Sequence, residues 1–174
     1  DSLLLMSQAG MEGGNALADV ISGKVTPSGK LTDTWAVDYE DYPSSDTFSS
    51  NDGNTDTETY TDDIYVGYRY FDSFGVEPAY EFGFGLSYTT FDTEINYVQA
   101  DEQTVTVNAT ITNTGDTYSG KEVLEVYFSA PGGKVEKPYQ ELAGYAKTDE
   151  LAPGAQQTLT VSFPVTEMSS YDED

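Results

Sequence analysis

The stretch that decides the fold is QTVTVNATITN, residues Gln103–Asn113. Apolar side chains occupy every second position from Val105 to Ile111, and polar side chains, mostly threonine, fill the positions between them. Successive side chains of a β-strand point to opposite faces of a sheet. This alternation therefore predicts a strand with one face against a core and the other face in water.

Two stretches further along the chain repeat the pattern, EVLEVYF at residues 122–128 and QTLTVSF at residues 157–163. Their apolar positions each fall on one side of a predicted strand: Leu124, Val126 and Phe128, then Leu159, Val161 and Phe163. The turn-forming sequences NTGDTYSG, APGG and LAPGAQ separate the strands. Residues 89–174 are therefore predicted to form an antiparallel β-sandwich of immunoglobulin type.

Residues 1–35 have a different pattern. SLLLM, residues 2–6, predicts a short buried strand, and NALADVISG, residues 15–23, predicts a helix that ends at Gly23. A strand and a helix form one end of an α/β unit but cannot make a domain alone. Because the chain also begins with Asp1 and not Met, we expect it to be a piece of something larger.

Residues 36–88 show no clear period and are predicted to be a connector. SSDTFSSNDGNTDTETYTDD, residues 44–63, is typical of a solvated loop or a disordered tract. EPAYEFGFGLSYTTF, residues 77–91, is rich in aromatic residues and glycine. Its rings and those just upstream could stack on a sugar, but we expect them to pack between domains: Tyr65, Tyr68, Tyr70, Phe82, Phe84 and Tyr88.

The composition removes several classes of function. The net charge is -24, with 7 Lys+Arg against 31 Asp+Glu, so nucleic acid and anionic membranes are poor partners. The chain has no Cys and no His, which excludes disulfides, thiolate metal sites and His-dependent triads. A cytoplasmic protein and a bacterial secreted protein are both compatible with this composition.

No motif marks a site. AGMEGGNALADV, residues 9–20, lacks the spacing of a dinucleotide-binding loop, and the acidic tract fails the calcium-loop spacing, which would put Phe48 at position one. Asn108 begins an N-x-[ST] sequon inside a predicted strand, where chance is the better explanation. None of the many carboxylates stands out as half of a catalytic pair. We therefore predict no catalytic, cofactor-binding or metal-binding residue and no cofactor.

Four motifs in this order resemble the C-terminal part of glycoside hydrolase family 3 enzymes, which include β-glucosidases and β-xylosidases. They are GMEGGNALADVISGKVTPSGKL at residues 10–31, IYVGYRYFD at 64–72, YEFGFGLSYTTF at 80–91, and VYFSAP followed by KPYQELAGYAKTDELAPG within 126–154. The resemblance implies three regions: residues 1–35 as the last strand and helix of an α/β sandwich domain, residues 36–88 as an inter-domain connector, and residues 89–174 as a fibronectin type III-like β-sandwich. It also implies that the sandwich is truncated at its C-terminal end.

The resemblance further implies that the catalytic groups lie outside this chain. The family nucleophile is an Asp in a Ser-Asp-Trp context on a (β/α)8 barrel, whereas the only Trp here is Trp35, in TDTWAVD. The acid/base Glu lies upstream of the segment matched here, and Glu12 matches a position that the family uses structurally. The implied partners are the barrel, the rest of the α/β sandwich domain and, through the parent enzyme, a carbohydrate.

The sequence thus predicts a mainly β chain that braces the catalytic domains of a retaining β-glucosidase or β-xylosidase and is inactive alone. Two other classes stay open. One is a free-standing immunoglobulin-like module that binds a carbohydrate or a protein, and the other is an acidic, calcium-dependent surface protein.

Overall fold

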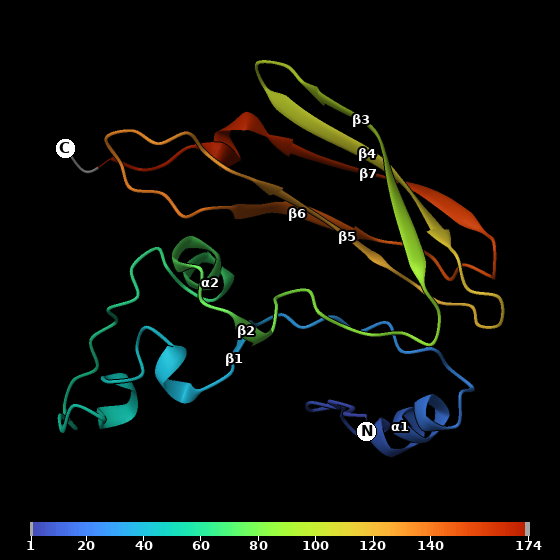
Figure 1. The fold of residues 1–174 in the computed structure, drawn as a ribbon, viewed down its shortest axis with the longest axis horizontal. Coiled ribbons are helices and arrows are strands. Elements are labelled where there is room, and N and C mark those ends of the chain that lie inside the picture. Colours follow the sequence, from blue (N-terminus) through green and yellow to red (C-terminus); the bar gives the residue numbers. More distant parts are fainter. Residues whose placement is uncertain (1, 173–174) are drawn as a thin grey trace.

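The computed structural model describes residues 2–172 of the chain. Two parts are visible in Figure 1: a β-sandwich made by the second half of the chain, and an irregular first half that runs along one side of it. Few of the residues are helical, and the sheets are antiparallel and open. The predicted fold class, a mainly β chain with an antiparallel β-sandwich, is confirmed.

The larger layer of the sandwich is a three-stranded sheet in the order β3-β4-β7. Its strands are β3 (Phe91–Ala100), β4 (Thr104–Asn113) and β7 (Gln156–Pro164), and both pairings are antiparallel. The second layer is the antiparallel pair β5 (Val123–Phe128) and β6 (Glu141–Lys147). The three alternating stretches of the sequence thus form β4, β5 and β7, as predicted.

The core lies between the two layers and consists of apolar side chains that alternation assigned to the inner faces, together with Leu151 from a predicted turn. Its buried members are Ala109, Ile111, Leu124, Leu151, Leu159 and Val161. One polar residue, Asn113, is fully buried beside them. Its amide donates to the backbone carbonyls of Tyr118 and Leu151, and its carbonyl oxygen accepts from Thr89 and Gly115, so its burial leaves no polar atom unpaired.

Strand β3 is covered far less than the strands beside it. Its inner-face residues Ile95 and Val98 pair with Ala109 and Val107 of β4, yet they are 63% and 62% exposed. Within the described residues, the outer edge of β3 and that of β5 carry no partner strand.

The predicted helix is present as α1 (Gly13–Ile21). It ends where the sequence predicts, because Gly23 takes the left-handed conformation with φ +75° and donates its N–H to the carbonyl of Val20. The buried strand predicted at residues 2–6 does not form, and Leu3 is 75% exposed. No strand among the described residues lies beside this segment to pair with it or cover it.

The connector holds a little regular structure. Strand β1 (Trp35–Ala36) pairs antiparallel with β2 (Pro78–Tyr80), and helix α2 (Tyr68–Phe74) precedes β2. Two 3-10 helices lie outside the acidic stretch, η1 (Tyr39–Asp41) and η3 (Val165–Met168). The acidic stretch itself, residues 44–63, contains only the short 3-10 helix η2 (Phe48–Ser50). This is the loop that the composition predicts.

Across residues 2–172, no helix combines the length and the apolar character needed to cross a membrane.

Candidate functional site

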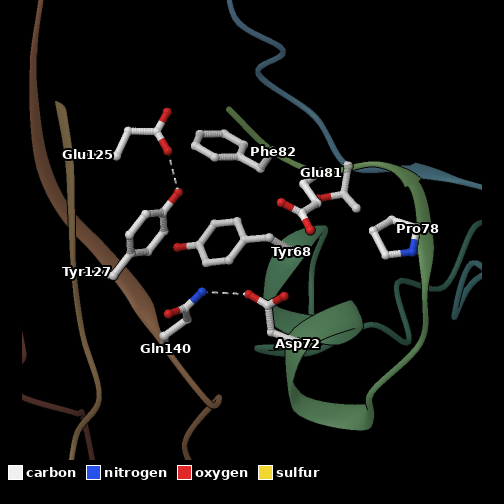
Figure 2. Close-up of a pocket in the computed structure, with 9 residues that line it drawn as sticks. Tyr68, Asp72, Pro78, Glu81, Phe82, Glu125, Tyr127 and Gln140 are labelled. Atoms are coloured by element: carbon white, nitrogen blue, oxygen red, sulfur yellow. Dashed lines mark hydrogen bonds between the residues drawn. The ribbon is translucent and has the colours of Figure 1, made fainter. Parts of the chain in front are cut away.

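A pocket lies where the connector crosses the outer face of the β5–β6 layer. It has a volume of about 300 Å³ and is shown in Figure 2. Its lining comes from four places in the chain: the residue before β1, helix α2, the segment around β2, and the β5–β6 layer. The lining residues are Thr34, Tyr68, Asp72, Pro78, Glu81, Phe82, Glu125, Tyr127 and Gln140.

The alternation of β5 places two polar side chains in the pocket. Leu124 and Val126 turn toward the core, so Glu125 and Tyr127 project from the opposite face of the strand. The Tyr127 hydroxyl donates to Glu125 Oε2 at 2.7 Å. Burial, and then this bond to the Glu125 carboxylate, raise the pKa of Tyr127 far above its usual range. Tyr127 is therefore a fixed hydrogen-bond donor and not a base.

Helix α2 supplies the facing side. Tyr68 and Asp72 are four residues apart, which places them on the same side of the helix. The Tyr68 ring packs edge-on against Tyr127 with centroids 5.7 Å apart, and its hydroxyl accepts the backbone N–H of Leu142. Asp72 accepts a hydrogen bond from the side-chain amide of Gln140 at 2.9 Å. These contacts hold α2 against the start of β6.

The glycines of the FGFG sequence explain how the connector approaches so closely. Gly83 has φ +81°, and a Cβ atom built on it would lie 2.6 Å from Glu125 Oε2. A Cβ atom on Gly85 would collide with the backbone carbonyl of Gly29. Only glycine satisfies both the conformation and the space at residue 83.

Charged side chains fasten the connector on either side of the pocket. Lys30 pairs with Glu122 at 2.8 Å and donates to the carbonyl of Gly85, with both charged side chains about four-fifths buried. On α2, Arg69 pairs with Glu141 of β6 at 2.8 Å.

A third contact runs from the sandwich to the first half of the chain. Lys147 donates to the carbonyl of Ser28. Burial lowers the pKa of Lys147, and the nearby Lys121 and Lys30 lower it further. The first half of the chain and the sandwich are thus joined by polar contacts as well as by rings.

The aromatic residues singled out from the sequence are in ring contact, but not as one group. Tyr68 touches Phe82 as well as Tyr127, and Tyr65 and Tyr70 both touch Phe74 of the same helix. The remaining pairs are Tyr70 with Phe71, Phe84 with Tyr80, and Tyr88 with Tyr118. Tyr68 and Tyr88 therefore reach residues of the β-rich half of the chain, whereas Tyr70 and Phe84 stay within the connector.

The carboxylates of the pocket could not be picked out from the sequence. Asp72, Glu81 and Glu125 are three of the 31 acidic residues, and only the packing of the connector on β5 brings them together. Pattern gives one partial signal, which is the placement of Glu125 and Tyr127 on the polar face of a predicted strand.

The other candidate sites gain no support from the geometry. Among residues 2–172, no group of three or more Asp, Glu, His or Cys side chains is arranged to hold a metal ion. The sequon residue Asn108 lies in β4, and its side-chain nitrogen donates to Thr160. The Glu12 carboxylate accepts a hydrogen bond from the side-chain amide of Asn15, three residues further along.

Comparison with known families gives two matches. The model of the glycosyl hydrolase family 3 C-terminal domain matches residues 1–88, and that of the fibronectin type III-like domain matches residues 122–174. Both agree with the resemblance read from the four motifs.

Comparison with known proteins finds relatives that are much longer than this chain. The chain is 45% identical to β-glucosidase A of Butyrivibrio fibrisolvens, covering 99% of the chain and 22% of that protein. It is 40% identical to an exo-α-(1→6)-L-arabinopyranosidase of Bifidobacterium breve, covering 88% and 20%. A solved structure, β-glucosidase 3B of Thermotoga neapolitana with glycerol, is 48% identical with a TM-score of 0.90, covering 97% of the chain and 23% of that structure. The chain therefore spans about a fifth of the length of the relatives it matches.

Proposed function

The chain belongs to glycosyl hydrolase family 3, and from this premise we propose that it is part of a longer enzyme that hydrolyses O-glycosidic bonds of β-glucosides. The observation that carries the proposal is the match of 99% of this chain to 22% of a β-glucosidase. In this proposal the reaction retains the configuration of the sugar and uses two carboxylates about 5 Å apart, one as nucleophile and one as acid/base. Neither belongs to this chain.

We propose a bracing role for the chain itself. Its first half exposes apolar side chains on and around α1: Leu3, Leu4, Leu5, Met6, Met11 and Ile21. A cluster of this kind is typical of a surface that another part of a protein covers. The Lys30–Glu122 and Arg69–Glu141 ion pairs then link residues 1–88 to the sandwich.

The family match does not by itself identify the sugar that the longer enzyme cleaves. One relative is named a β-glucosidase and another an arabinopyranosidase, although each matches most of this chain. A region shared by enzymes of different specificity supports a role other than choosing the sugar. The β-xyloside alternative therefore stays within the proposal.

The test begins with the mass of the native protein, detected in its source cells with an antibody raised to this chain. We expect a band several times larger than 19.0 kDa, and we expect the captured protein to hydrolyse p-nitrophenyl β-D-glucoside or β-D-xyloside. The 174-residue chain produced alone should show no turnover. A native band at 19.0 kDa would overturn the proposal and favour the free-standing binding module.

A further inference from the structure

The pocket of Figure 2 carries negative charge that no lining residue compensates. Asp72, Glu81 and Glu125 line it, and no Lys or Arg does. The Glu81 carboxylate makes no hydrogen bond or ion pair with the described residues, and Asp72 receives only the neutral amide of Gln140. Figure 2 shows the three carboxylates around the ring of Tyr68. A concave site of one sign of charge concentrates ligands of the opposite sign.

A second observation points to a missing partner in the same place. Thr34 also lines the pocket and is only 5% exposed, yet its hydroxyl oxygen has no hydrogen-bond partner among the described residues. Buried polar atoms in folded proteins are almost always paired, and an unpaired one costs about 1–3 kcal/mol. A hydrogen-bond donor seated in the pocket would supply that partner.

The residues that line the pocket indicate which kind of hydrogen-bond donor would fit it. Tyr68, Phe82 and Tyr127 contribute aromatic rings, and the carboxylates lie beside them. A bare metal ion does not fit, because the described residues hold no group of acidic side chains arranged as metal ligands. A neutral sugar would leave three neighbouring carboxylates uncompensated. A guanidinium is planar, weakly hydrated, stacks on aromatic rings and donates to carboxylates in pairs.

We propose that this pocket binds a guanidinium group, with Glu81 and Asp72 accepting its N–H donors beside the ring of Tyr68. The inference does not depend on the proposed hydrolase function, because it rests on the pocket alone. A free small guanidinium compound and an arginine side chain of a protein share this chemistry.

The experiment titrates the full, uniformly ¹⁵N-labelled chain with capped arginine, N-acetyl-L-argininamide, at constant ionic strength. The matched control ligand is N-acetyl-L-citrullinamide, which replaces the guanidinium with a neutral urea of nearly the same shape. We expect saturable amide shifts at Asp72, Phe82 and Gln140 with the arginine compound and none with the citrulline compound. A parallel titration with methylguanidine, which carries the same single charge as capped arginine, separates the sources, since tighter binding of capped arginine indicates a protein side chain and tighter binding of methylguanidine a small molecule.

Glu81→Gln and Glu77→Gln form the matched pair of variants. Both residues are exposed, so neither change should disturb folding, but only Glu81 lines the pocket. We expect Glu81→Gln to weaken binding about three- to fivefold, the effect of one partly exposed charge, and Glu77→Gln to leave it unchanged. Equal shifts with both ligands, no shift at these amides, or saturation by methyl β-D-glucoside instead would each overturn the proposal.

Discussion

Gly83 and Glu125 together set how closely the connector lies on the sandwich. The backbone of Gly83 is in the left-handed region and faces the Glu125 carboxylate with no room for a Cβ atom. Glu125 is itself held by the Tyr127 hydroxyl, so it cannot move away without losing a hydrogen bond. One missing methyl group thus allows contact between two segments far apart in the sequence.

Replacing Gly83 by alanine should therefore destabilise the chain in two ways. The positive φ costs about 1–2 kcal/mol for any residue with a Cβ atom, and displacing Glu125 adds about 1 kcal/mol for its lost hydrogen bond. Gly53→Ala is the matched control, because Gly53 has φ +84° but open space around it. Urea unfolding should show the larger loss for Gly83→Ala. Equal losses would mean that the Glu125 contact contributes nothing.

Asp101 gives a prediction for pH. Backbone N–H groups of Gln103 and Thr104 donate to its carboxylate in the β3–β4 turn and lower its pKa below the usual 3.8. A lowered carboxyl pKa stabilises the folded state above the unfolded-state pKa, and the contribution is lost as pH falls through the folded-state pKa. Asp101→Ala should be destabilising at pH 7, and its deficit relative to the unchanged chain should shrink below about pH 4.

Urea midpoints of the two proteins at pH 7 and pH 3 check this expectation. Asp101→Asn, which keeps an acceptor oxygen but no charge, should show a deficit that depends less on pH. A deficit of Asp101→Ala that is the same at both pH values would contradict the role given to the charge.

At the scale of elements, alternation found the strands that keep a regular register and missed those that do not. β4 and β7 alternate without interruption, and their side chains follow the predicted faces. In β3 a register shift between Ile95 and Tyr97 inserts one residue, so the apolar positions change phase part-way along the strand. β6 has a similar shift, because Val126 and Tyr127 of β5 pair with Gly144 and Leu142, which leaves Ala143 as the extra residue in β6. A period of two cannot be recognised across a bulge.

The pocket could not be predicted from the sequence, for a different reason. Its lining combines Thr34 with residues from 68–82 and 125–140, and no local pattern predicts which carboxylates of so acidic a chain will meet. The likeness to a known family predicted the fibronectin type III-like fold, but no site residue could be carried over from it.

The difference in burial between the inner-face side chains of β3 and β4 can be measured directly. Ile111 is fully buried and Ile95 is 63% exposed, although both belong to the inner face of the same sheet. Ile111→Ala should cost about 2–5 kcal/mol of unfolding free energy, and Ile95→Ala about 0.5 kcal/mol or less. The two variants change the same atoms, so urea unfolding compares burial alone. A cost above about 2 kcal/mol for Ile95→Ala would mean that β3 is covered in solution, for example by self-association.

At the scale of the whole molecule, repulsion among the excess acidic side chains destabilises the compact folded state. The chain carries a net charge of -24, and several of its 7 basic residues are used in ion pairs and hydrogen bonds to the backbone. The remaining acidic excess repels itself across the surface in the folded state.

Salt should therefore stabilise this chain. Raising sodium chloride from about 0.01 M to 0.15 M shortens the screening length from about 30 Å to 8 Å, which removes most long-range repulsion. We expect Tm to rise by several degrees over this range. The measurement is a thermal melt followed by circular dichroism, with equal ionic strengths of sodium sulfate to separate screening from anion effects. A Tm that falls with salt would show that attractive surface ion pairs outweigh the repulsion.

The pairing of β1 with β2 closes the acidic residues 37–77 into one loop. The chain entropy lost in closing a flexible loop grows only with the logarithm of its length, at about 0.6 kcal/mol for each doubling. Residues 44–63 could therefore be lengthened, or exchanged for a tag or a small inserted domain, at little thermodynamic cost, provided that the ends of the loop keep their pairing. The length of this loop can therefore vary at little cost in stability, whereas β1 and β2, which close it, must keep their paired geometry.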